Sequence, residues 1–536
     1  MNGFRRIRIL LVIGAVLALS AAAWAEGIFQ VNDPGSGNWV FDQPSVVANG
    51  TVIHVAFVGD NAAGVGGSPN TRLYYAAVNG SSDFTKTTTT RDHVRLTVPV
   101  AIDDDSLYSG ARHPQIALRS AKELAILFQA IPAGETGYKL FRALVKIDNN
   151  AVTSRRIDKI VDSSGNGISG TDPSFALVTA DNTMRVAFAS APSLLAPSSS
   201  DVYYARVALD NAAVLDNTLI LLTKAASSTG TSPLPRLRLD GNLNSHVVWA
   251  ADDDATGTPT GIYYAMVKAI PHAVADNLAI GATPVLSGGY RWRFPNVVLA
   301  TSKNYLWVLA ADEPFGSSSG TAGSLGIAWL NPYAVKHDGE PVSVNNLGTN
   351  SLFFLNPPGG AVLSSDFDAY RPETWIDPQS RLHVAGYGFR SSLFPYLGTA
   401  GRYYAMSLGT TSAGTGTSSV FAGLVSSPVP VGLGDVAFAM QIPGDYTRPA
   451  FAHLSRRAIQ FWSGPDNVLA GDTGARNLYV TSVLDSPDNA PVTQSGCSIV
   501  DDPRRGEAGR IPGAAVLLLP AAFLALRKAA RKAFAR

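Results

Sequence analysis

The chain has 536 residues, of which 46% are hydrophobic and 15% are charged, and it contains 50 glycines, 33 prolines and 1 cysteine. Its formal net charge of +1 is unevenly distributed: the first 25 residues contribute +3 and residues 497–536 contribute +5, so residues 26–496 carry −7. This mildly acidic central region excludes nucleic acid as a partner, because phosphate binding requires a basic surface. The single cysteine excludes an intramolecular disulfide and argues against a cysteine-ligated metal site or a Cys–His catalytic pair there.

The first 25 residues have the three-part layout of a secretory signal peptide. Basic residues are followed by an apolar stretch at 9–19 and by a small-x-small triplet at 23–25. This layout predicts cleavage between Ala25 and Glu26, with the export machinery as a partner. An uncleaved N-terminal anchor is the alternative, although the apolar stretch is shorter than the roughly 20 residues that a membrane span needs.

Residues 26–488 predict an all-β ectodomain. Short alternating apolar runs are separated by Gly, Asn, Asp and Ser, and no long helical periodicity occurs. A unit repeats along this region: a proline, an apolar strand, a polar turn and a second apolar strand. Seven copies open at Pro44, Pro114, Pro173, Pro235, Pro295, Pro372 and Pro449. Proline lacks an amide donor, so we expect it at the first residue of a strand.

Each copy continues with a third strand and a fourth apolar run. The clearest third strand is Tyr-Tyr-Ala, at 74–76, 203–205, 263–265 and 403–405. Four short strands repeated seven times predict a seven-bladed β-propeller, in which ring closure removes most exposed edges. Two stacked sandwiches and an open β-solenoid are the alternatives.

Two details of the propeller can also be predicted. The segment 27–41 is expected to supply the strand that completes the last blade. Neighbouring residues on a strand face opposite ways, so we expect one tyrosine of each pair to pack between blades and the other to reach the rim.

Four of the seven openings carry an arginine one or two residues before the proline: Arg112, Arg293, Arg371 and Arg448. The starts of the first strands line the funnel of a propeller, and the forked donors of arginine suit carboxylates. These four residues are therefore the candidate ligand-binding residues. In the alternative interpretation they hold blade loops through carbonyl groups, or pair with Asp172, Glu373 or Asp368.

This arginine arrangement resembles that of the sialidases, propellers that bind a sugar carboxylate with an arginine cluster. The resemblance implies a glycan-processing enzyme that works in the funnel. The family's Asp-box, Ser-x-Asp-x-Gly-x-x-Trp, is absent from every unit, and neither its Tyr/Glu nucleophile pair nor its acidic aspartate can be identified.

Other polar clusters predict structural roles. The histidines at 54, 246 and 383 share one position in three different blades, well apart around a ring, so we expect no metal trio. The acidic runs 103–105 and 252–254 offer oxygen ligands of the kind calcium prefers, but neither has an ordered Asp-x-Asp-x-Asp-Gly loop. No phosphate loop, Gly-x-Ser-x-Gly elbow or His-Glu-x-x-His helix occurs, so no cofactor is expected.

The C-terminus begins with a polar linker at 489–510 that contains Gly496 and Cys497. An apolar run at 511–526 and a Lys/Arg cluster complete the chain, and basic residues after an apolar run stay cytoplasmic. The run is short and contains two prolines, so it predicts a hydrophobic helix that spans the membrane marginally or temporarily.

The succession of Gly-Cys-Ser, an apolar run and a basic cluster resembles the bacterial C-terminal sorting tails of the JDVT-CTERM and MYXO-CTERM class. The resemblance implies a membrane-embedded processing protease as a partner, with processing or modification at Gly496 and Cys497. An incidental cysteine in a polar linker is the alternative.

These features together predict an exported bacterial protein, anchored in the membrane or held at the cell surface, with an extracytoplasmic ectodomain. Before processing, its basic C-terminus is expected in the cytoplasm. The ectodomain is expected to act as a binding module for a protein, a glycan or a surface polymer. A glycan-processing enzyme with an arginine-lined funnel is the alternative function.

Overall fold

The computed structural model of the chain describes a set of strands and the turns that join them. The described residues are 29–32, 40–60, 71–82, 91–102, 107–190, 201–224, 233–251, 261–269, 278–286, 292–300, 305–312, 325–330, 353–354, 367–376, 382–390, 399–406, 429–430, 450–454, 457–465 and 476–484. The chain divides into two compact units, Met1–Asp488 and Asn489–Arg536, and all described residues belong to the first. The predicted signal peptide, linker and hydrophobic helix lie outside them.

Helix is almost absent from the described residues. They include the short helix α2 (Arg91–Val94) and the 3₁₀ turn η1 (Thr179–Asp181). Within these residues, no helix has the length and apolar character needed to cross a membrane.

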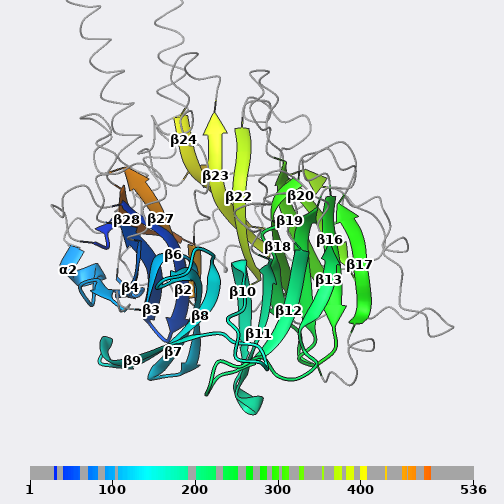
Figure 1. Cartoon of the computed structure of the whole chain (residues 1–536). Helices are drawn as coiled ribbons and strands as arrows, with labels where there is room; N and C mark the ends of the chain where they lie inside the picture. Colours follow the sequence, from blue (N-terminus) through cyan, green and yellow to red (C-terminus); the bar gives the residue numbers. More distant parts are fainter. Residues whose placement is uncertain are drawn as a thin grey trace, which may run out of the picture. The chain divides into compact units, whose positions relative to one another are not determined.

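Five antiparallel sheets each contain four strands in chain order (Figure 1). The first two are β6 (Tyr108–Ser120), β7 (Glu123–Pro132), β8 (Lys139–Asp148) and β9 (Ala151–Lys159); and β10 (Thr171–Val178), β11 (Thr183–Ala189), β12 (Asp201–Ala208) and β13 (Ile220–Lys224). The third and fourth are β14 (Arg236–Leu239), β15 (Ser245–Ala251), β16 (Gly261–Val267) and β17 (Leu278–Leu286); and β18 (Trp292–Ala300), β19 (Tyr305–Asp312), β20 (Leu325–Leu330) and β21 (Phe353–Phe354). The fifth is β22 (Phe367–Ile376), β23 (Leu382–Arg390), β24 (Thr399–Met406) and β25 (Val429–Pro430).

The sixth sheet joins the two ends of the domain. Its path is β26 (Ala450–Leu454), β27 (Arg457–Pro465), β28 (Arg476–Leu484), β2 (Val40–Asn49), β3 (Val52–Asp60), β4 (Arg72–Asn79) and β5 (Val100–Ala101), and β1 (Phe29–Gln30) pairs with β28 off this path. The link between β28 and β2 is a single parallel bridge, Val40 with Arg476. The sheet therefore consists of two four-stranded groups, β2–β5 and β26–β28 with β1. The closing strand expected from the segment 27–41 is β1.

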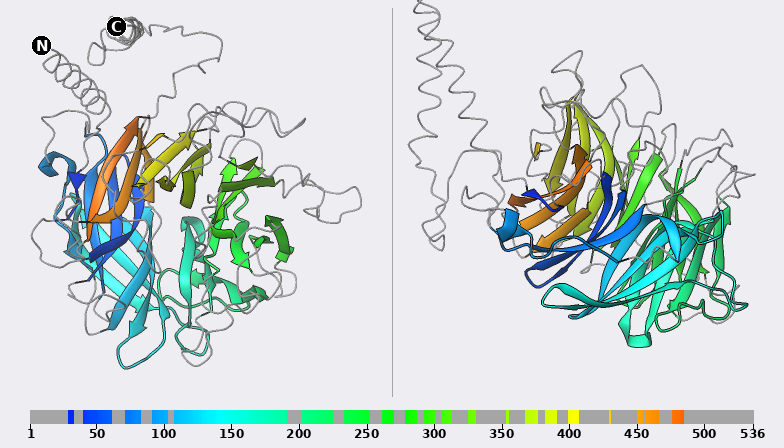
Figure 2. Two further views of the ribbon diagram at one scale, coloured as in Figure 1. Left: turned by 90° about the horizontal axis from the view of Figure 1, so that it is seen from above. Right: turned by 60° about the vertical axis from the view of Figure 1, so that its left-hand side comes forward.

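The first strands of consecutive sheets lie side by side. Strand β2 contacts β6, and the same holds for β6 with β10, β10 with β14, β14 with β18, β18 with β22, and β22 with β26. Strand β26 in turn contacts β2, and Figure 2 shows the sheets following one another in chain order. The prediction of an all-β fold with a propeller-like arrangement of four-stranded sheets is confirmed.

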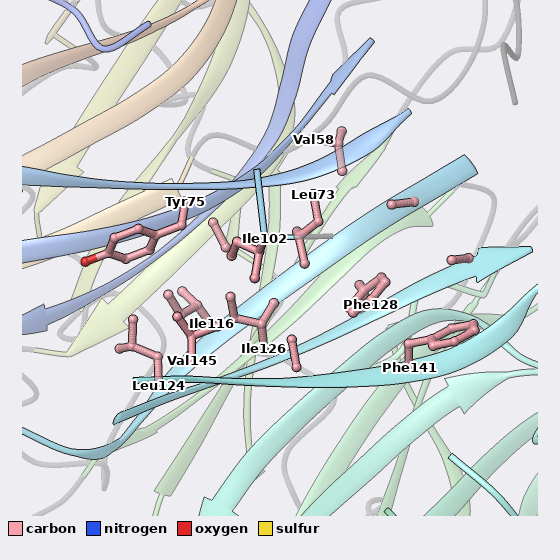
Figure 3. Packing of buried hydrophobic residues seen from close by; sticks show 14 of the residues in the cluster. Val58, Leu73, Tyr75, Ile102, Ile116, Leu124, Ile126, Phe128, Phe141 and Val145 are labelled. Atoms are coloured by element: carbon pink, nitrogen blue, oxygen red, sulfur yellow. The ribbon is translucent and has the colours of Figure 1, made fainter. Parts of the chain in front are cut away.

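The hydrophobic core lies between neighbouring sheets. One cluster joins β3 and β4 to β6–β8, and it includes Leu73, Tyr75, Ile126 and Phe128, each at most 1% exposed (Figure 3). Further clusters join β26–β28 to β1–β4, β7 and β8 to β10–β12, and β11–β13 to β14–β16. The second and third strands are almost continuously buried, whereas the fourth strand β9 is largely exposed. Stacking of sheet faces therefore supplies the apolar burial that stabilises the domain.

The tyrosine pairs follow the expected division only in part. The second tyrosines, Tyr75, Tyr204 and Tyr264, are each 1% exposed, and Tyr75 and Tyr204 pack in the core shared with the next sheet. The first tyrosines do not simply reach the rim, since Tyr203 and Tyr263 pack against the core shared with the preceding sheet. The first tyrosine is half-buried in the copies at 203 and 263, but Tyr74 is also buried, against Phe41 and Phe57.

Candidate functional site

Five of the opening prolines do not stand at the start of their strands, which corrects the sequence prediction for them, whereas Pro235 directly precedes β14. In five sheets the proline lies inside the first strand, and it is tolerated because a β-bulge removes it from the ladder. The bulge always consists of the proline and the residue before it, opposite one residue of the second strand. The bulged pairs are 43–44, 113–114, 172–173, 294–295 and 371–372.

The residue before the proline has an unusual backbone conformation. Its φ is 57° at Gln43, 50° at His113, 49° at Asp172 and 48° at Leu234. Positive φ is uncommon for residues other than glycine and costs of order 1–3 kcal/mol. The surrounding contacts must hold each of these residues in place, and the hydrogen bonds around the openings do so.

The bulge separates Arg112, Arg293 and Arg371 into two register positions. Arg112 and Arg293 precede the bulge and pair with Gln129 and Ala311. Arg371 is itself a bulge residue. Arg448 lies outside the described residues, as do the side chains of Arg293 and Arg371 and the predicted processing residues Ala25, Glu26, Gly496 and Cys497.

Arg112 is the one predicted arginine whose side chain is described. It is half-buried, and its guanidinium carbon lies 5.8 Å from the centroid of the Tyr138 ring. A cation over a tyrosine face at this distance is attracted by the ring. Arg112 thus lies at the opening of β6 with an aromatic neighbour.

Side chains at these openings bind the backbone of the next sheet. The residue after the proline accepts a hydrogen bond from the amide two residues after the proline of the following sheet. The three bonds are Ile116 N to Ser45 Oγ (3.1 Å), Phe175 N to Gln115 Oε1 (3.4 Å) and Leu237 N to Ser174 Oγ (3.0 Å). These amides lie at the outer edge of a first strand, where no further strand of the sheet pairs. The side chains therefore accept hydrogen bonds from donors that would otherwise be unpaired.

The bulge residues form a second set of bonds between sheets. The amide of His113 donates to Gln43 Oε1 at 2.5 Å, and the amide of Asp172 donates to Gln129 Oε1 at 2.6 Å. His113 Nε2 also lies 3.3 Å from Asp172 Oδ1. The bulges at His113 and Asp172 are thereby connected to the sheet before them, which compensates for the positive φ of these two residues.

Sequence reasoning missed both sets of bonds, although a signal is present. A polar residue follows the opening proline in six of the seven copies, and only Ala450 departs from the pattern. The polar residues are Ser45, Gln115, Ser174, Arg236, Asn296 and Glu373.

A buried histidine and the second tyrosine of the same sheet form a polar pair. His54 Nδ1 lies 2.8 Å from Tyr75 Oη, and Tyr75 donates its hydroxyl proton to the carbonyl of Asn150 at 3.1 Å. A hydroxyl has one proton, so His54 must donate from Nδ1, which leaves Nε2 as an acceptor. That nitrogen is buried and has no partner among the described residues, and burial lowers the pKa of His54 to about 4.

The equivalent pair in the β14–β17 sheet has the opposite proton arrangement. His246 Nε2 lies 3.2 Å from Asp240 Oδ2, so this nitrogen donates, and Nδ1 accepts the hydroxyl proton of Tyr264 at 2.8 Å. Burial alone would raise the pKa of Asp240, but hydrogen bonds from His246 and Asn244 outweigh it and hold that pKa below its usual value. Burial raises the pKa of Tyr264.

Arginines take over these positions in the two intervening sheets. Arg142 replaces the second tyrosine in β8; it is 0% exposed and forms an ion pair with Asp158. Burial lowers its pKa, and the charge of Asp158 opposes that effect. Arg185 replaces the histidine in β11 and pairs with Asp181 at 3.0 Å. Each of the four sheets from β2–β5 through β14–β17 thus contains a buried histidine or arginine among apolar residues.

The expected structural role of the histidines agrees with this arrangement. His54 and His246 bind tyrosines of their own sheets, and the backbone of His383 has the same register relative to Tyr404. In the described part of the chain no three His, Cys, Asp or Glu side chains gather in a way that could hold a metal. The acidic runs 103–105 and 252–254 lie outside the described residues.

Comparison with known proteins gives distant similarity only. No protein-family model and no curated protein matches the sequence. Similar solved structures include a protein of unknown function from Dyadobacter fermentans, which is 10% identical with a TM-score of 0.43 and covers 86% of this chain and 98% of that one. An endo-arabinase from Bacteroides thetaiotaomicron is 12% identical with a TM-score of 0.33, covering 58% and 98%. A GH43_1 enzyme from Xanthomonas citri is 10% identical with a TM-score of 0.33, covering 90% and 99%. Similarity at this level carries no argument about activity, so the architecture rests on the strand pairing.

The bond between Ser174 and Leu237 predicts a measurable contribution to stability. Ser174→Ala leaves a buried amide without its acceptor, and we expect a loss of about 1–3 kcal/mol in the free energy of unfolding. Urea unfolding measures this loss, and hydrogen exchange of the Leu237 amide should become faster. The control is Ser154→Ala on the exposed strand β9, expected to change stability by less than about 0.5 kcal/mol. Equal effects of the two substitutions would contradict this role.

The buried His54 predicts a pH dependence of stability. Its pKa is about 4 in the folded chain against 6.5 when unfolded, so between these values the unfolded state binds a proton that the folded state does not. Stability therefore falls as the pH decreases from about 6.5 to 4, by about 3 kcal/mol from this group, and is restored above 6.5.

Urea unfolding of wild type and His54→Asn between pH 7 and pH 4 tests this expectation. The advantage of the wild type should shrink by about 3 kcal/mol across the range. The same substitution at the exposed His93 serves as the control for replacing a histidine by asparagine. A constant difference between wild type and His54→Asn would show that His54 does not titrate in this way.

Proposed function

We propose that this chain is an exported, surface-associated protein whose seven-bladed β-propeller acts as a binding module. Support for seven blades comes from the division of the strands into seven four-stranded groups, five separate and two joined through the bridge from Val40 to Arg476. The succession of contacts between first strands, which runs from β2 to β26 and back to β2, also supports a ring. Strand β1 then completes the seventh blade.

The observation that carries the binding role is the use of polar side chains at the strand openings. Ser45, Gln115 and Ser174 bind backbone amides of the next sheet, and Gln43 and Gln129 bind bulge amides. These residues stabilise a scaffold. We infer that recognition is left to other side chains at the openings, and the four opening arginines are our candidates.

The ligand class follows from the chemistry of these arginines. A guanidinium group binds a carboxylate through two parallel hydrogen bonds, which favours acidic glycans, acidic surface polymers or acidic protein segments. A glycan-processing enzyme with an arginine-lined funnel is the second candidate. The position of Arg112 over the Tyr138 ring favours it, because an arginine and a tyrosine at one opening are what an acidic-sugar site requires.

Export and retention complete the proposal. The N-terminal segment directs export and is removed between Ala25 and Glu26. The tail holds the protein at the membrane, with its basic end in the cytoplasm, until a membrane-embedded protease acts near Gly496 and Cys497.

Binding to a carboxylate-bearing polysaccharide tests the binding role. We expect the mature protein to bind immobilised alginate or polygalacturonate and not neutral dextran. Combined replacement of Arg112, Arg293, Arg371 and Arg448 by alanine should raise the Kd at least about 10-fold, since charged hydrogen bonds are lost. The control is Arg155→Ala with Arg156→Ala on the exposed strand β9, which should bind normally. New reducing ends would favour the enzyme, and equal binding by both variants would exclude the arginine site.

The tail proposal is tested by replacing Cys497 with alanine. We expect the variant to change in surface retention or in the mass of its mature C-terminus, because processing or modification occurs at this residue. Cell fractionation and intact mass analysis provide the measurement, and Ser495→Ala serves as the control. Unchanged fractionation and mass would remove the sorting-tail interpretation.

A further inference from the structure

The N-terminal strand β1 pairs with β28 through a short ladder, in a site formed by residues 477–480 that we call the β28 groove. Its ladder consists of two residue pairs, Phe29 with Val480 and Gln30 with Tyr479. The amide of Val31 adds a hydrogen bond to the carbonyl of Leu478 at 2.8 Å. Strands in globular proteins usually contain five or six residues, so β1 is short even for an edge strand.

The recognition of β1 is nevertheless specific. Asn32 is 1% exposed, and its side chain is bound at both ends: Nδ2 donates to Asn477 Oδ1 at 2.7 Å, and Oδ1 accepts from the amide of Leu478 at 2.8 Å. Val31 is 1% exposed and packs in the core formed by β26–β28 and β1–β4. The groove therefore accepts an extended segment with an apolar residue followed by asparagine.

The groove does not depend on β1 for its own formation. Strands β27 and β28 pair over nine consecutive residues, from Arg457 with Leu484 to Pro465 with Arg476, and β26 pairs with β27 on the other side. Without β1, β28 keeps its pairing with β27 and its bridge to β2, but the backbone groups of residues 478–480 that β1 engages lose their partners. Unpaired strand edges are templates for pairing with another strand.

We propose that β1 is exchangeable, so that the Phe29–Asn32 segment of one copy of this chain occupies the β28 groove of another. The segment that occupies the groove belongs to the same chain as β28, and a second copy of the chain carries an identical segment. In dilute solution β1 of the same chain outcompetes β1 of another copy, because a short connection gives it an effective concentration of millimolar order. Copies held close together reach comparable concentrations and exchange strands. The inference goes beyond the proposed function and rests on the described pairing alone.

Disulfide trapping between different copies tests the exchange. Gln30 and Tyr479 are register partners, and paired residues in antiparallel strands have Cα atoms about 4.5–5.5 Å apart, within disulfide range. One chain carries Gln30→Cys and a second carries Tyr479→Cys, both with Cys497→Ser. After mixing at high concentration and mild oxidation, we expect a disulfide-linked heterodimer.

A register-mismatched pair provides the matched control. Gln30→Cys is mixed with Val483→Cys, four residues along β28 and roughly 13 Å away, and should give at least 10-fold less heterodimer. An excess of free peptide spanning residues 27–34 should suppress the matched heterodimer. The same peptide with Asn32→Ala should compete roughly 10-fold less well, because two buried hydrogen bonds are lost.

The double variant Gln30→Cys with Tyr479→Cys reports whether the groove is intact, since it should form the bond within one chain. Intramolecular bonding without a matched heterodimer overturns the exchange. Equal heterodimer from matched and mismatched pairs overturns it as well, since random collision would explain both. Failure of the double variant to form its internal bond overturns the pairing on which the inference rests.

Discussion

The structure depends on how the free edge of each first strand obtains hydrogen-bond partners. In a stack of sheets this edge has no neighbouring strand, and unpaired amides there would cost free energy. The chain meets this constraint with side chains, because the residue after the opening proline accepts the bond from the next sheet. The bulge that contains the proline is part of the same arrangement, since it turns the strand where these bonds form. The side chains that provide acceptors for the free edges therefore also join neighbouring sheets.

Four of the sheets combine apolar packing with a buried histidine or arginine. His54, Arg142, Arg185 and His246 occupy related positions, and each is almost completely buried. A buried polar group with the wrong partner is costly, so these groups penalise a shifted register more strongly than leucine or valine would. The two histidines show that the hydrogen bonds of such a group depend on its immediate neighbours. The same residue pair adopts opposite proton arrangements, depending on whether the tyrosine meets a backbone carbonyl or the histidine meets a carboxylate.

Much of the architecture was predictable because its signals are local and repeated. Alternating apolar runs and the recurring proline and Tyr-Tyr-Ala motifs indicated four-stranded units, and the short segment before Pro44 provided the closing strand. The bulges were not predicted, since a proline at a strand start and a proline in a bulge look alike in sequence. For the same reason Arg112 and Arg371 seemed equivalent by their closeness to a proline, whereas they occupy different register positions. Partners such as Ser174 with Leu237 lie in different sheets, so no local pattern identifies them.

The five hydrogen bonds from side chains at the strand openings to backbone amides of the next sheet have the same direction, and this has a consequence for assembly. In each of the five the acceptor side chain belongs to the earlier sheet and the donor amide to the later one. A chain that emerges N-terminus first therefore always presents a finished acceptor to the sheet that follows, so sheets can be added one at a time without waiting for distal sequence. Strand β1 is the exception, because it is made first and its partner β28 is made last. The pairing of β1 with β28 is thus the last to form, although it uses the first residues of the domain.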